Sequence, residues 1–74
     1  MILQKIKHDE DLIKLVGGVV LLDLVVPING GFTIGSFKVT GTRENHLGRF
    51  IIGRDEEGQK HTINVNNIVG YKRR

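Results

Sequence analysis

The sequence predicts a mainly β fold, in which a short N-terminal helix is followed by about five bent antiparallel strands in a small barrel. Runs of apolar and β-branched residues, each of strand length, alternate with turns rich in Gly, Asn and Asp. Ten glycines lie mostly at the expected turns and bends. A chain of 74 residues is the length of one small domain, spanning 1–74.

The helix is expected at about residues 9–16. Asp9 is in position to cap its first turn, and the acidic residues that follow suit the positive end of a helix dipole. Gly17 can adopt the left-handed conformation that ends many helices. One apolar stripe is expected, formed by Leu12, Ile13, Leu15 and Val16.

The first strand, at about residues 19–26, is apolar at every position except Asp23. An antiparallel strand with one face in water alternates apolar and polar residues, so both faces of this strand are expected to need cover. The helix or a second subunit could supply it. Asn29-Gly30 then predicts a tight hairpin turn, because both of its central residues need positive φ.

Four further strands follow, with a bulge or bend expected at Gly35 and a polar turn at 42–46. Phe37 and Val39 are expected to face the core and Lys38 to face solvent. A second tight turn is expected at 55–58. The strands are predicted at about residues 32–42, 47–54, 60–65 and 68–71, after which the basic C-terminus trails off.

Positive charge is concentrated in the second half of the chain. Residues 35–74 contain eight Lys and Arg and four Asp and Glu, whereas residues 1–34 carry a net charge of −1. A basic surface attracts nucleic acid, so we expect electrostatic binding of RNA or DNA, RNA being favoured. Phe50, His61 and Tyr71 are candidate stacking groups. The candidate binding residues are Arg43, Arg49, Arg54, Lys60, His61, Lys72, Arg73 and Arg74.

The sequence favours a binding module over an enzyme. It has no cysteine, and Ser36, the only serine, has no His or Asp at a catalytic spacing. The three histidines form no metal-binding pair, so neither metal nor other cofactor is expected. No stretch is long enough to span a membrane, and a cytoplasmic location is expected. The alternative function is a protein-interaction or self-assembling accessory module, such as a phage-borne protein that docks on a larger target. A homo-oligomer is a further expectation, because a chain of this size buries a marginal core and has no cysteine for a disulfide.

Two segments resemble the Sm-like family, to which the bacterial RNA chaperone Hfq belongs. They are Lys60-His61-Thr62-Ile63-Asn64-Val65 near the end of the chain and Ile28-Asn29-Gly30-Gly31-Phe32 at the first hairpin. The resemblance implies a ring of small barrels, in which the last two strands pair between subunits and RNA lies in a pore lined by Lys60 and His61. The chain has Thr40-Gly41-Thr42 where the family has a glycine–aromatic–aspartate signature, which leaves a generic SH3-like barrel as the other fold.

Overall fold

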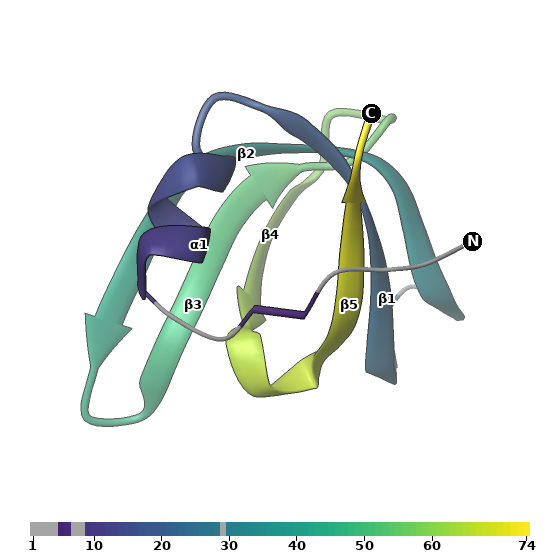
Figure 1. Cartoon of the computed structure of the whole chain (residues 1–74). Coiled ribbons are helices and arrows are strands. Elements are labelled where there is room, and N and C mark those ends of the chain that lie inside the picture. The colour runs from purple at the N-terminus through teal and green to yellow at the C-terminus, as the bar shows by residue number, and fades with distance from the viewer. Residues whose placement is uncertain (1–4, 7–8, 29) are drawn as a thin grey trace.

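The computed structural model describes residues 5–6, 9–28 and 30–74. A short helix precedes five strands, and a single turn of 3-10 helix separates the last two strands (Figure 1). In chain order the elements are α1 (Asp9–Leu15), β1 (Val19–Ile28), β2 (Gly31–Asn45), β3 (Gly48–Arg54), β4 (Lys60–Asn64), η1 (Val65–Asn67) and β5 (Ile68–Arg73).

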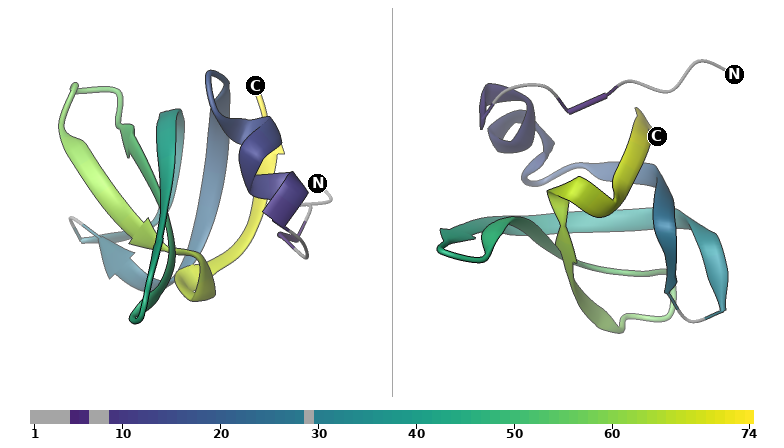
Figure 2. Two further views of the ribbon diagram at one scale, coloured as in Figure 1. Left: turned by 90° about the vertical axis from the view of Figure 1, so that its left-hand side faces the viewer. Right: turned by 90° about the horizontal axis from the view of Figure 1, so that it is seen from below.

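The five strands form one antiparallel sheet in the order β4-β3-β2-β1-β5. The predicted mainly β fold with a short helix and five antiparallel strands is therefore confirmed. The sheet is bent but not closed, because β4 and β5 are its two edges and do not pair with each other. Figure 2 shows these edge strands as the two arms of the open sheet, joined at one end by η1. The small barrel that the sequence predicts is therefore not closed in the structure.

The core lies inside the bend of the sheet. Phe37, Val39, Ile51 and Ile63 come from three adjacent strands and are all at most 1% exposed. Their positions follow the alternation of side chains along each strand, and Lys38 faces solvent as predicted. The full core is Leu12, Leu15, Val20, Leu22, Leu24, Phe37, Val39, Ile51, Ile63 and Tyr71.

The helix α1 covers one side of this core with only half of the predicted stripe. Leu12 and Leu15 are buried, but Ile13 and Val16 are exposed. A helix of seven residues makes only about two turns, so it can present only a narrow face to the core. Gly17 has the predicted positive φ, and the proposed cap at Asp9 falls on a side chain outside the described residues.

The strand β1 is buried on one face up to Leu24, and its other face is only partly covered. Val19 is exposed, Leu21 is half-buried, and Val25 and Val26 are exposed near the first hairpin. The helix therefore does not cover the second face of β1, although the sequence predicts that both faces need cover. The predicted turn includes Asn29, which lies outside the described residues.

Two local irregularities bend the long strand β2. Its pairing with β1 shifts at the predicted bulge, where Ser36, and not Gly35, takes a positive φ of 49°. Its pairing with β3 shifts again between Val39 and Gly41. At Gly53, on β3, an added Cβ would collide with the carbonyl oxygen of Lys38, so only glycine permits this approach of the two strands.

Three strands continue beyond their predicted ends, namely β1 to Ile28, β2 to Asn45 and β5 to Arg73. The strand β2 continues to Asn45, so the polar turn expected at 42–46 is wrong and the chain reverses at His46 and Leu47 instead. The strand β5 continues to Arg73, where the sequence predicts a trailing end. Hydrogen bonding to β1 extends β5, because that pairing satisfies its backbone groups as far as the N–H of Arg74.

Candidate nucleic-acid interface

Three basic residues form one row across the solvent side of the sheet. The register places Lys38 on β2 directly opposite Arg54 on β3, and Arg54 directly opposite Lys60 on β4. All three side chains are exposed. Residues that are directly opposite in neighbouring strands have their Cβ atoms about 4.5–5.5 Å apart on the same face. The three cations are therefore adjacent, although the first and the last are 22 positions apart in the sequence.

The same face continues toward the β2–β3 hairpin without a charged residue until Arg43. Ile52 pairs with Thr62, and at the far end Phe50 lies between Arg43 and Asn64. Phe50 and Ile52 are half-buried, but neither belongs to the core, so both contribute apolar surface to the outside of the sheet. We call this surface the outer basic face; its members are Lys38, Thr40, Arg43, Phe50, Ile52, Arg54, Lys60, Thr62 and Asn64.

The outer basic face carries four cations, and no carboxylate pairs with any of them within the described residues. Asp55, Glu56 and Glu57, which follow Arg54 in the chain, line a depression at the end of the sheet instead. Glu44, which follows Arg43, is directly opposite Arg49. Like charges directly opposite each other in a sheet are destabilising. The row of Lys38, Arg54 and Lys60 therefore costs folding stability and creates a positive potential that an anionic partner would lower.

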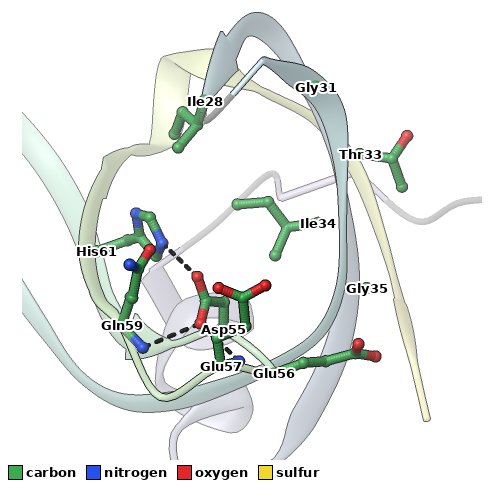
Figure 3. Close-up of a pocket in the computed structure, with 10 residues that line it drawn as sticks. All are labelled: Ile28, Gly31, Thr33, Ile34, Gly35, Asp55, Glu56, Glu57, Gln59 and His61. Carbon is green, nitrogen blue, oxygen red and sulfur yellow. Dashed lines mark hydrogen bonds and ion pairs between the residues drawn. The ribbon is translucent and has the colours of Figure 1, made fainter.

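His61 does not belong to this face, although it follows Lys60 in the sequence. Consecutive residues of a strand point to opposite sides of the sheet, and the side chain of His61 is only 14% exposed on the inner side. Its Nε2 lies 2.9 Å from Oδ2 of Asp55 (Figure 3). The centroid of its ring lies 6.3 Å from that of Phe37. His61 is therefore a packed histidine at the end of the sheet and not a stacking group on its outer side.

Asp55 holds the β3–β4 turn together. Its Oδ1 accepts the backbone N–H groups of Glu57 and Gln59, and its Oδ2 accepts the hydrogen of His61 (Figure 3). These bonds, above all the one from His61, hold the pKa of Asp55 below its ordinary value of 3.8, against the smaller opposing effect of burial. Gly58 completes the predicted turn with a positive φ, and its carbonyl accepts a hydrogen bond from Arg54.

The depression beside this turn is open and has a volume of about 570 Å³. Ile28 and Ile34 form apolar walls, and the acidic turn forms the opposite side (Figure 3). Asp55 is already bonded to His61, and Ser36 is bonded to Arg74 and not to His61. The described residues therefore form no Ser–His–Asp arrangement, and they contain no group of three potential metal ligands.

The structure separates the remaining predicted binding residues from the outer basic face. Arg49 is opposite Glu44 and lines a different surface hollow beside η1. Arg73 donates to the carbonyl of Lys14 at the end of α1. Lys72 is exposed on β5, opposite Leu21. Arg74 lies next to Val19, and its guanidinium donates to the hydroxyl of Ser36.

Of the three candidate stacking groups, only Phe50 lies on the outer basic face. Tyr71 is buried in the core, and His61 is on the inner side. The sequence-based site omitted Lys38, although its outward position between Phe37 and Val39 was predicted. The missing signal was the register between β2 and β3, which alone makes Lys38 a neighbour of Arg54.

Comparison with known protein families, curated protein sequences and solved structures finds no match to this chain. In the part of the chain that the structure describes, none of the helical segments has the length and apolar character of a membrane span. The outer basic face is thus the feature on which a functional proposal rests.

Proposed function

We propose that this chain is a non-catalytic nucleic-acid-binding module that uses the outer basic face. The observation that carries the proposal is the adjacency of Lys38, Arg54 and Lys60 on three neighbouring strands. Solubility alone would be served as well by cations spread over the surface, without the repulsion between neighbours. A phosphate backbone offsets that repulsion and releases its own counterions on binding.

The apolar and small polar residues between the cations support the same function. Phe50 offers an aromatic edge or face to a base or sugar, and Asn64 and Thr62 offer hydrogen-bonding groups beside it. The two large apolar side chains of this face, Phe50 and Ile52, do not belong to the hydrophobic core. The uncharged residues between the cations could contact bases, and the cations themselves could contact phosphates, as expected of a nucleic-acid-binding surface.

We further propose that the open sheet belongs to the class of small SH3-like or Sm-like folds. An N-terminal helix, five strands with β1 between β2 and β5, and a 3-10 turn between β4 and β5 support this assignment. The pore implied by the Sm-like resemblance has less support, because Lys60 and His61 point to opposite sides of the sheet.

The test compares two double variants that lose the same charge. Lys38→Gln with Lys60→Gln removes two cations from the outer basic face, and Lys5→Gln with Lys14→Gln removes two exposed cations outside the sheet. Fluorescence anisotropy with labelled RNA and DNA oligonucleotides is expected to show a large loss of affinity for the first variant only. Equal losses would mean that net charge, and not this face, determines binding, and the assignment of the site would be wrong.

The second candidate function is a protein-interaction or self-assembling module. Exposed apolar side chains on and near the first hairpin favour it, namely Val25, Val26 and Phe32, together with Val69 on β5. Two unpaired sheet edges, β4 and β5, add backbone groups that another strand could use. Light scattering on nuclease-treated protein tests it: a mass several times 8.3 kDa supports this candidate, and a monomer counts against self-assembly.

A further inference from the structure

We infer that the preferred ligand is a double-stranded nucleic acid, held so that the outer basic face lies over one groove and its cations contact both phosphate strands. The inference rests on the proposed function and concerns the form of its ligand. It follows from the placement of the four cations and from what lies between them.

The cations occupy the two ends of the face. Lys38, Arg54 and Lys60 form the row at one end, and Arg43 lies five residues further along β2 from Lys38. A strand rises about 3.3 Å per residue, and the bulge between Val39 and Gly41 shortens the path, so about 13–16 Å separates the two ends. The row of Lys38, Arg54 and Lys60 runs perpendicular to the strands, and Arg43 is displaced from this row in the direction of the strands.

A duplex presents the same pattern of charge. Two phosphate strands flank each groove, which in B-form DNA is about 6 Å wide on the minor side and about 12 Å on the major side. With side chains that reach outward, cations about 13–16 Å apart can each meet one of the flanking strands. The strip between them, which includes Ile52, Thr62 and Phe50, then faces the groove, where it meets no phosphate.

A single strand fits this face less well. Proteins that bind single strands place successive bases on several aromatic side chains. The outer basic face has one aromatic residue, Phe50, and that ring is half-buried between Arg43 and Asn64. A single backbone that followed the row of Lys38, Arg54 and Lys60 would also leave Arg43 without a phosphate.

Arg43 is therefore the residue that distinguishes the two modes. On a duplex it neutralises a phosphate of the second strand, so four contacts give a log–log salt slope of about −3.6 and a loss of affinity of about 150-fold between 50 and 200 mM salt. Arg43→Gln is expected to reduce these to about −2.7 and about 40-fold. Lys14→Gln, an exposed cation on α1, is the matched control and is expected to leave the slope unchanged.

The experiment measures anisotropy of a labelled DNA duplex, an RNA duplex of the same sequence and each separate strand over this salt range, with thermal melts to confirm that each variant folds. We expect at least one duplex to bind at least tenfold tighter than its separate strands. We also expect Arg43→Gln, but not Lys14→Gln, to lower the salt slope. Comparison of the two duplexes shows whether DNA or RNA is preferred. Strands bound as tightly as duplexes, or a slope insensitive to Arg43→Gln, would overturn the inference and leave the proposed function standing. No binding of any oligonucleotide would overturn the proposed function itself.

Discussion

Replacing Lys38 and Lys60 together by glutamine is expected to stabilise the free protein at low salt, although the change adds nothing to the core. Each lysine is directly opposite Arg54, so the double variant removes two repulsive pairs. The guanidinium of Arg54 keeps its hydrogen bond to the carbonyl of Gly58, which is why the lysines are replaced and not the arginine. A site selected for binding at the cost of stability should respond in this way.

The size of the effect follows from the geometry. With the charges about 7 Å apart in a water-like dielectric, Coulomb's law gives about 0.6 kcal/mol per pair, and screening at 0.1 M salt reduces it by about half. Two pairs then contribute about 0.6 kcal/mol, within the range measured for cross-strand charge pairs. In a domain of this size the midpoint of thermal unfolding should rise by about 2–5 °C.

The assay is thermal unfolding followed by circular dichroism at low salt and at 1 M salt. The increase should disappear at 1 M salt, where the screening length is about 3 Å. Arg43→Gln is the control, because Arg43 is opposite Phe50 and has no cation directly across from it. A variant that is less stable at low salt, or a gain that persists at 1 M salt, would show that repulsion along the row is not the cause.

Two further predictions concern the elements that hold this face in place. Gly53→Ala should lower the free energy of unfolding by about 3 kcal/mol or more, because the new Cβ would collide with the carbonyl oxygen of Lys38. Gly41→Ala is the control, since an added Cβ there meets no atom within 4 Å, and it should change that free energy by about 1 kcal/mol or less. Chemical denaturation of both variants measures the difference. Ionised Asp55 stabilises the fold at neutral pH, and this contribution should be lost as pH falls below 3.8 through its lowered pKa. Asp55→Asn should be less stable at neutral pH and lose less stability than the wild type between pH 5 and pH 2.5. The same loss of melting temperature in both proteins over that range would show that ionised Asp55 does not stabilise the fold.

The candidate site was only partly predictable from the sequence. Concentration of charge in the second half of the chain identified Arg43, Arg54 and Lys60, which the structure brings to one face. It also included Arg73 and Arg74, whose guanidinium groups bond to other parts of the fold. Charge content reports which residues are basic, but it carries no information on which of them share a surface.

His61 shows the same limit at the level of one strand. Consecutive residues of a strand alternate between its faces, so His61 and Ile63 share a face opposite to Lys60. A pore lined by both Lys60 and His61, as the Sm-like resemblance implies, is at odds with that alternation within a single chain. The partner of His61, Asp55, was visible in the sequence only as a turn residue, because the bond between them depends on how the hairpin closes.

The local features of this protein follow from its sequence: the helix near residues 9–16, the strands of the sheet, the turn at 55–58, and the inward direction of Phe37 and Val39. These depend on residues close in the chain, through periodicity and backbone preference. The tertiary structure alone decided that the sheet stays open and that β5 pairs with β1.

Tertiary structure also decided that Lys38 lies beside Arg54. Such pairings join residues far apart in the sequence, and a shift of one residue would move a whole strand's side chains to the other face. The basic row exists because the bulge between Val39 and Gly41 and the glycine at position 53 fix that register.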